Sequence, residues 1–411
     1  MSTLVATPFR IWPSVDTTPL AAQRTKPFLV LTSIAVALGV VVTFEPSPSD
    51  VAISLLFVGG FLSGAIKWDH KLTLPYTLLG LFVVANLASL CYSIDLAKGG
   101  VYFGVTMFMI VSWVFVIGVL NRFGQQGADA IMTAFTFGGV ASTLAATLCY
   151  FNLLPFGEWL LFYDRLKGLF KDPNVFGPYL VIVSIYALHR VLLGGNLWKR
   201  LTWLGSCLIG SVGVLLCYSR AAWMNYGVTL LLFFGLLTIA GRGSLRKNLS
   251  YFIICIIIVG AAVGYAMTIP QIAEVVSYRS ELQSYDADRF ANFHAALQLG
   301  INNPLGVGPV QSFLLLDYAT HNVYLRVFSE NGILGFVSFT LFLFVTLVRT
   351  LLLSQRSADR SQRDLFALVS AALCGTMLNS FTIDTLHWRH FWLLLAFGWM
   401  PLWKTTQKRR V

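Results

Sequence analysis

Residues 323–348 read VYLRVFSENGILGFVSFTLFLFVTLV, and this run decides the class of fold. It is longer than the roughly 20 apolar residues that a helix needs to cross a lipid bilayer. Its two charged residues, Arg326 and Glu330, stand four positions apart, so one helical turn lets them pair inside the run. The run therefore predicts a transmembrane helix that carries an internal ion pair.

Similar apolar runs fill the rest of the chain. Of its 411 residues, 56% are hydrophobic and only 11% are charged, against about 25% charged in a typical soluble protein. The candidate spans lie near 28–44, 51–66, 75–94, 97–120, 128–152, 176–193, 198–217, 220–240, 250–269, 323–348, 365–383 and 388–403. They must be helical, because backbone groups in lipid have to be satisfied within the segment. We therefore expect an all-α integral membrane protein of about twelve transmembrane helices, forming one polytopic domain over residues 1–411.

The lysines and arginines predict how the chain is oriented. With the N-terminus in the cytoplasm, 20 of the 29 basic residues fall in inner segments and eight in outer segments. Cytoplasmic loops carry the excess of positive charge in membrane proteins. Both termini are therefore expected in the cytoplasm. Residues 270–322, between spans nine and ten, become a long outer loop that carries short helices.

Composition also excludes several classes of function. The net charge is +11, but the basic residues sit in short loops between apolar runs, so nucleic-acid binding is not expected. The six cysteines lie in or beside apolar spans without the spacing of metal ligands, and we interpret them as packing residues. No phosphate-binding loop, nucleophile elbow or zinc-protease motif is found.

The stretch 285–335 is polar where its surroundings are apolar. It gathers acids, two arginines, two histidines, glycines and amides. A solvated surface loop explains such a composition at any single position. A site at the outer face of the membrane explains why so many polar residue types occur together between two spans.

The outer basic residues oppose the general charge rule, which makes them informative. Arg165, Lys167 and Lys171 share one loop, Arg220 opens a span, and Arg289 lies in the long loop. An outward-facing site that binds anionic groups would explain this placement. The alternative is that outer loops simply tolerate some lysine and arginine.

Two of these arginines are expected at helix starts. Ser219 is a good N-cap, which places Arg220 in the first turn of a helix, where backbone amides and a guanidinium can converge on one phosphate. Asp286 or Asp288 is expected to cap a second helix and so to place Arg289 in the same position. The alternatives are that Arg220 reaches the lipid headgroups and that Arg289 pairs with Asp286.

His321 stands where the long loop enters the tenth span and is followed by Asn322. A neutral imidazole there can act as general base toward a hydroxyl group. The alternative is a histidine that merely caps the helix or lies at the membrane interface. The Asp286–Asp288 pair has the spacing of some metal sites, but helix capping explains it, so no metal ion is expected.

At these residues the chain resembles the O-antigen ligase and polymerase superfamily of bacterial envelope enzymes. The resemblance covers roughly residues 165–335. It rests on Arg165 with Gly168 and the Asp172-Pro173-Asn174 turn, on Ser219-Arg220, on Arg289 with the turn at 303–308, and on His321-Asn322 followed by Glu330-Asn331-Gly332.

The resemblance implies a glycosyltransferase. Polysaccharide would pass from undecaprenyl pyrophosphate to lipid A–core oligosaccharide at the periplasmic face of the inner membrane, without metal or other cofactor. His321 would be the catalytic base, and Arg220 and Arg289 would hold the pyrophosphate. The residues implied in substrate binding are Arg165, Lys167, Asn174 and Asn322.

Other functions remain open at this point. A polymerase would use the same donor with another undecaprenyl-linked glycan as acceptor, and a protein O-oligosaccharyltransferase would use serine or threonine. One long outer loop before the tenth span resembles the ligases more than the polymerases. A lipid-linked-oligosaccharide flippase also has many spans, but it needs charges deep in a two-sided path, whereas the charges here gather at the outer face.

Overall fold

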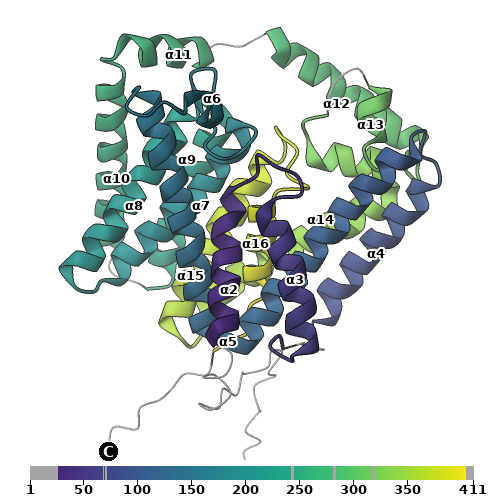
Figure 1. Ribbon diagram of the computed structural model, residues 1–411, viewed down its shortest axis with the longest axis horizontal. Helices are drawn as coiled ribbons and strands as arrows, with labels where there is room; N and C mark the ends of the chain where they lie inside the picture. The colour runs from purple at the N-terminus through teal and green to yellow at the C-terminus, as the bar shows by residue number, and fades with distance from the viewer. Residues whose placement is uncertain are drawn as a thin grey trace, which may run out of the picture.

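A computed structural model describes residues 26–67, 69, 72–241, 245–280, 284–316 and 320–403. These residues form a bundle of helices with one short two-stranded hairpin (Figure 1). The first part of the chain forms α2 (Lys26–Ala37), the 3-10 turn η1 (Leu38–Val40), α3 (Pro48–Leu62), α4 (Thr73–Leu90), α5 (Leu96–Tyr150), α6 (Gly157–Leu160), β1 (Leu161–Phe162) and β2 (Arg165–Leu166). The second part forms α7 (Pro173–Leu193), α8 (Leu197–Leu216), α9 (Arg220–Ile239), α10 (Leu245–Ala266), α11 (Pro270–Ser280), α12 (Ser284–Asn302), α13 (Gln311–Leu315), α14 (Val323–Arg356), α15 (Arg360–Asn379) and α16 (Arg389–Gly398).

Within the described residues, six helices are long and apolar enough to cross a membrane: α4, α5, α7, α8, α9 and α14. α5 has 55 residues, which at about 1.5 Å per residue is long enough for two passes. It contains the predicted spans 97–120 and 128–152. The protein is therefore an all-α, multi-span membrane protein, while the predicted count of twelve spans is not confirmed. The shortfall arises partly at short helices such as α16, which has ten residues.

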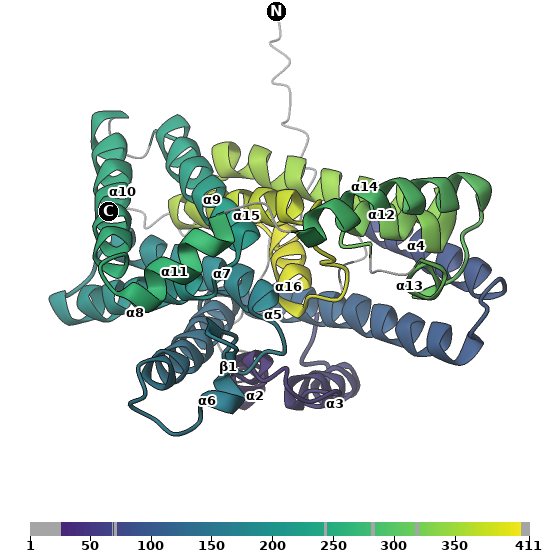
Figure 2. The ribbon, with the colours of Figure 1, turned by 90° about the horizontal axis from the view of Figure 1, so that it is seen from above.

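Two glycines interrupt the longest helices. Gly124 in α5 has φ of 54°, and Gly332 in α14 has φ of 67°. Both angles lie in the left-handed region, which glycine adopts without steric cost. Figure 2 shows that the two halves of α5 run in different directions. The break at Gly332 divides α14 into a short first segment and a long second one.

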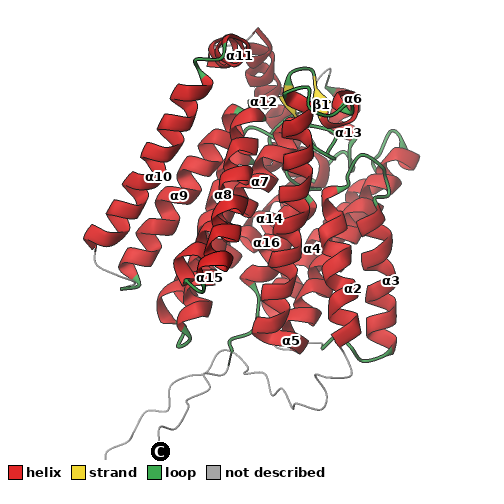
Figure 3. Ribbon diagram, turned by 60° about the vertical axis from the view of Figure 1, so that its left-hand side comes forward, coloured by secondary structure: helices red, strands yellow, loops and turns green. Residues whose placement is uncertain are grey.

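The helices pack in antiparallel and crossing pairs, with α7 along α8, α9 along α15 and α4 along α14. α6, the β1–β2 hairpin, α11 and α12 lie together at one end of the bundle, which we call the loop end (Figure 3). The loop end also holds the residues that connect α8 to α9, because α8 runs toward it and α9 runs away from it.

The break in α14 is closed by a turn from another part of the chain. Three backbone hydrogen bonds join them: Val307 N to Ser329 O at 3.0 Å, Gly308 N to Glu330 O at 2.9 Å, and Ile333 N to Pro304 O at 2.9 Å. A Cβ at Gly306 would overlap the Glu330 carbonyl, and one at Gly332 would overlap the Pro304 carbonyl. The two glycines therefore let two backbones touch, and the donors of the turn satisfy carbonyls that the broken helix leaves open.

Candidate active site

Arg165 lies in the β1–β2 hairpin and is almost fully buried, with 7% of its surface exposed. Its Nε donates to the Cys217 carbonyl and its Nη2 donates to Asn174 Oδ1, both at 2.9 Å. Asn174 is fixed in turn, because its backbone N–H donates to Asp172, the N-cap of α7, at 2.8 Å. Arg165 and Asn174, which the sequence analysis implied in substrate binding, therefore lie in contact.

α9 begins at Arg220, as predicted. Ser219 is its N-cap, and the serine hydroxyl accepts a hydrogen bond from the Ala222 amide at 3.4 Å. Because the first amides of a helix have no partner within the helix, its start attracts anions. The predicted place of Arg220 in the first turn of a helix is thus confirmed.

The turn before α9 links Arg165 to Arg220. Cys217, whose carbonyl accepts from Arg165, is three residues before Arg220 in the chain. Between them, Tyr218 has φ of 47°, which is unusual for a residue with a side chain. Its hydroxyl is 2.9 Å from the hydroxyl of Tyr150, and this partly buried contact supports the turn. Arg165 therefore contacts the turn that leads directly into Arg220.

His321 lies two residues before the first residue of α14 and also has a positive φ, of 45°. Asn322 caps the helix, because its Oδ1 accepts from the amides of Tyr324 at 3.0 Å and Leu325 at 3.1 Å. The cap fixes the backbone next to His321. Asn322 therefore positions His321, whatever further contact it makes with a substrate.

The packing of α9 against α15 relates these two helix starts in space. Thr229 of α9 donates to the Ala371 carbonyl of α15 at 3.4 Å. Asn225, one turn before Thr229 on α9, packs against Gly375, which is one turn after Ala371 on α15. The two helices are therefore antiparallel, and the start of α9 lies beside the end of α15.

Arg220 lies a little more than one turn before Asn225 on α9, and Ser380 lies equally far after Gly375. The antiparallel pairing therefore places Arg220 at the level of Ser380. The carbonyl of Ser380 accepts from the Val323 amide at 3.0 Å, at the first residue of α14. His321 is two residues before Val323. The starts of α9 and α14 thus both lie at the end of α15, which places Arg220 and His321 at the same level of the bundle.

Arg289 lies in α12, but its side chain and those of Asp286 and Asp288 fall outside the part of the structure that is described. The expectation that one of these aspartates caps the helix is wrong, because α12 already includes both. Capping residues precede a helix, and this helix begins earlier than its apolar stripe suggested. The far end of α12 packs on α14, where Gly300 contacts the ring of Phe328.

The two lysines of the hairpin loop have different surroundings. The Lys167 backbone amide donates to the Leu160 carbonyl at 3.1 Å, so this residue completes the hairpin. Lys171 pairs with Glu45 at 2.8 Å, and both side chains are more than half exposed. Such a surface pair contributes little to stability. The structure thus places Lys167, but not Lys171, in the hairpin that holds Arg165.

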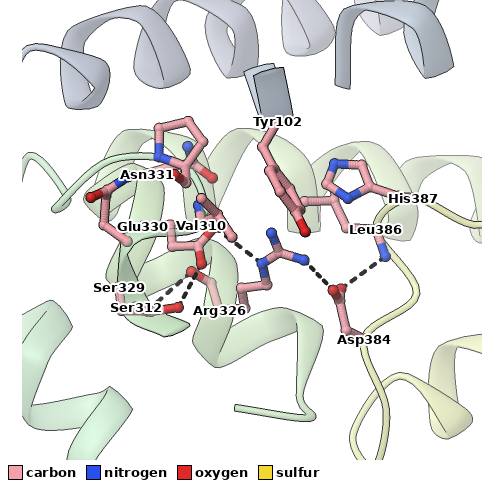
Figure 4. Close-up of polar contacts among 12 residues, drawn as sticks. Tyr102, Val310, Ser312, Arg326, Ser329, Glu330, Asn331, Asp384, Leu386 and His387 are labelled. Atoms are coloured by element: carbon pink, nitrogen blue, oxygen red, sulfur yellow. Dashed lines mark hydrogen bonds and ion pairs between the residues drawn. The ribbon is translucent and has the colours of Figure 1, made fainter. Parts of the chain in front are cut away.

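A buried ion cluster supports the first segment of α14 (Figure 4). Arg326 Nε and Glu330 Oε2 are 3.0 Å apart, which confirms the predicted pair. Glu330 is 2% exposed. It also accepts from the Val310 amide at 2.8 Å and from the Ser312 hydroxyl at 2.5 Å. Since the carboxylate has several donors, we assign it to holding the turn at 303–312 against α14.

Asp384 completes this cluster and was missed by the sequence analysis. Arg326 Nη1 donates to its carboxylate, which also accepts from the Leu386 amide at 3.1 Å. Burial alone would raise the pKa of Asp384, but the charges of Arg326 and His387 and the hydrogen bonds to the carboxylate together lower the pKa below its usual range. A single acid in the short loop between two predicted spans gave no motif, so only the folded chain identifies it.

His387 follows Asp384 in the same short loop between α15 and α16. Its Nε2 is 3.0 Å from the Thr106 hydroxyl, and its ring lies 5.7 Å from that of Tyr102. Burial, and after it the nearby Arg326, lower the pKa of His387 to about 3. The imidazole is therefore neutral at physiological pH and serves as a hydrogen-bonding partner.

The described side chains contain no group of three or more His, Cys, Asp or Glu residues that could hold a metal ion. The Asp286–Asp288 pair lies outside that part of the structure.

A comparison with protein families matches residues 205–340 to the O-antigen ligase family, over a segment that begins in α8 and ends in α14. No curated protein matches the chain. The matched segment includes Arg220, Arg289 and His321, together with the turn that closes the break in α14. Residues 205–340 of this multi-span membrane protein therefore match the O-antigen ligase family.

Proposed function

We propose that this chain transfers O-antigen polysaccharide from undecaprenyl pyrophosphate to a sugar hydroxyl of lipid A–core oligosaccharide. The observation that supports this most is that two helix starts lie at the end of α15. One start carries Arg220 beside Arg165, and the other carries His321. Cations at a helix start suit a pyrophosphate, and a neutral imidazole nearby suits a hydroxyl.

The chemistry divides between these residues. The acceptor hydroxyl oxygen forms a bond to the anomeric carbon of the donor sugar, while the bond from that carbon to the pyrophosphate oxygen breaks. His321 takes the proton from the hydroxyl group. Arg220 and Arg289 stabilise the negative charge that develops on the leaving undecaprenyl pyrophosphate. No cofactor is needed for this exchange.

The remaining residues orient the site. Asn174 holds the guanidinium of Arg165 at 2.9 Å, and Arg165 holds the turn that leads to Arg220. Lys167 stands in the same hairpin and supplies a further positive charge toward the donor. Asn322 caps α14 and fixes the backbone next to His321.

We place this site at the periplasmic face of the bacterial inner membrane, with both chain termini in the cytoplasm. The distribution of lysine and arginine supports this orientation. The gathering of α6, the hairpin, α11 and α12 at the loop end supports residues 270–322 as a periplasmic segment of one domain, residues 1–411 (Figures 1 and 3).

Reconstitution with defined substrates tests the proposal. The purified protein in liposomes receives undecaprenyl-pyrophosphate-linked glycan, with or without lipid A–core. We expect a glycosylated lipid A–core product, seen as a shift on a gel, that forms only when both substrates are present. Extension of the donor glycan in the absence of lipid A–core would contradict ligase activity and assign the chain as a polymerase.

An arginine away from the loop end provides the matched control. Arg200 is exposed near the start of α8, at the opposite end of the bundle. Arg200→Ala should transfer glycan at the wild-type rate, whereas Arg220→Ala should not. Equal rates in both variants would contradict the location of the site.

A further inference from the structure

A cavity of about 220 Å³ lies between α2, α3, α5, α7 and α16, beside the candidate active site but separate from it. It is larger than the roughly 150 Å³ cavity that can hold a benzene molecule. Most of its wall is apolar or aromatic, including Phe108, Tyr179, Trp388 and Trp392. No residue of the proposed reaction lines it.

Two polar groups in this wall lack partners among the described residues. The Nε2 of His390 and the hydroxyl of Ser112 are both buried and make no hydrogen bond. His390 as a whole is 3% exposed and is surrounded by the rings of Trp388 and Tyr179. Buried polar groups are almost always paired, so these two indicate an occupant that can accept hydrogen bonds.

Both cations at the wall are already paired with carboxylates. Arg389 donates to both carboxylate oxygens of Asp50, at 2.6 and 2.5 Å. Lys171 pairs with Glu45 at 2.8 Å. With both cations paired, the cavity offers no site for a phosphate. The occupant therefore carries no negative charge where it meets the wall.

The wall can be compared with the parts of the two proposed substrates that could occupy the cavity: a polyprenyl chain, a sugar ring and an acyl chain. A polyprenyl chain carries no hydrogen-bond acceptor, so it would leave His390 and Ser112 unpaired. A sugar ring carries a hydroxyl on most of its carbons and would leave several of them unpaired against an apolar wall. An acyl chain with an ester carbonyl near one end matches both the apolar wall and the two donors.

The position of the cavity connects it to the site. Lys171 and Asp172 line the cavity. Asp172 caps α7 and holds Asn174, which binds Arg165. A lipid whose chain enters the cavity would thus have its head next to the residues that bind the donor. One turn further along α5 and α16, the wall is formed by Val116 and Leu393, which suit the apolar part of the chain.

We propose that this cavity binds one ester-linked acyl chain of the lipid-borne acceptor, with His390 Nε2–H and the Ser112 hydroxyl donating to the ester carbonyl. The inference rests on the proposed function, because it assigns the anchor of the acceptor whose sugar is glycosylated. It makes His390 and Ser112 binding residues that recognise the lipid and take no part in the chemistry.

Transfer to acylated and de-O-acylated lipid A–core tests this assignment. The double variant His390→Phe with Ser112→Ala keeps the volume of the wall and removes both donors. Loss of one neutral hydrogen bond changes affinity by roughly three- to tenfold. We therefore expect KM for the acylated acceptor to rise at least about tenfold with kcat unchanged, and KM for the de-O-acylated acceptor to stay at the wild-type value. The same rise for both acceptors, or no rise for either, would overturn the proposal.

Ser184→Ala is the matched control, because Ser184 is also a buried serine without a hydrogen-bond partner but lies outside the cavity. It should leave both KM values unchanged, and a change equal to that of the double variant would overturn the proposal.

A binding measurement separates failure of this inference from failure of the proposed function. Acceptor with brominated acyl chains should quench the fluorescence of Trp388 and Trp392, and the His390 and Ser112 double variant should weaken this quenching. This quenching depends only on binding, so it is expected even if no transfer is seen with any acceptor. Quenching by brominated phospholipid that excess acceptor does not displace would assign the cavity to bulk membrane lipid and overturn the proposal.

Discussion

Replacement of Gly332 by alanine should strongly destabilise the protein. Gly332 has φ of 67°, and a Cβ at this position would overlap the Pro304 carbonyl. The conformation alone costs about 1–3 kcal/mol for a residue with a side chain. The three backbone hydrogen bonds that close the break in α14 contribute about 1 kcal/mol each. Partial loss of these bonds brings the expected cost to about 4 kcal/mol.

Gly227→Ala is the matched control, because Gly227 lies in α9 with open space around its Cα. Alanine is a better helix former than glycine by up to about 1 kcal/mol, so this variant should be as stable as the wild type or slightly more stable. The assay is thermal unfolding of the purified variants in detergent. We expect the midpoint of Gly332→Ala to fall at least about 5 °C below that of Gly227→Ala. Equal midpoints would refute the interpretation that the turn at 303–308 locks the break.

Three further results are expected. Glu330→Gln should cost about 3–5 kcal/mol in thermal unfolding, because a buried arginine then loses one of its two carboxylate partners. Arg326→Met should cost less stability in the Glu330→Gln background than in the wild type, because one of its two partners is already gone. An equal cost in both backgrounds would contradict the pairing. The pKa of His387 falls from 6.5 to about 3 on folding. Between pH 6.5 and 3, His387 is therefore protonated in the unfolded chain but neutral in the folded protein. The free energy of unfolding should fall as the pH falls through this range, by at most about 1.4 kcal/mol per pH unit. His387→Gln should flatten that slope in melts compared between pH 7 and 5, and an unchanged slope would show that the group does not titrate as described. Transfer should survive a metal chelator, and loss of transfer that magnesium restores would assign the Asp286–Asp288 pair as metal ligands.

The sequence predicted features that depend on neighbouring residues. The pair Arg326 and Glu330 follows from one turn of helix, and the cap Ser219 follows from the residue before an apolar run. Both are local, so a single sequence is enough to predict them. The apolar runs likewise predicted a helical membrane protein, although composition alone did not establish how many helices are long enough to cross.

Features that depend on distant residues could not be predicted. Asp384 joins the ion cluster only because α14 and the loop before α16 meet in space. The turn at 303–308 and the break at Gly332 were visible as two separate glycine-containing motifs, but their mutual closure depends on the packing of two backbones. The contact of Arg165 with the turn before Arg220 also joins two loops that the sequence keeps more than fifty residues apart.

In the proposed reaction, Arg220 binds the donor while His321 activates the acceptor. The most direct measurement is the rate of glycan transfer by purified His321→Ala and Arg220→Ala, taken together with the affinity of each variant for the lipid-linked donor. We expect His321→Ala to bind donor like the wild type and to transfer about a hundredfold to ten-thousandfold more slowly. Arg220→Ala should lose both transfer and donor affinity, and lysine should replace it poorly because it lacks the planar fork. Transfer by His321→Ala at close to the wild-type rate would contradict the account and place the base elsewhere, with His294 the next residue to test.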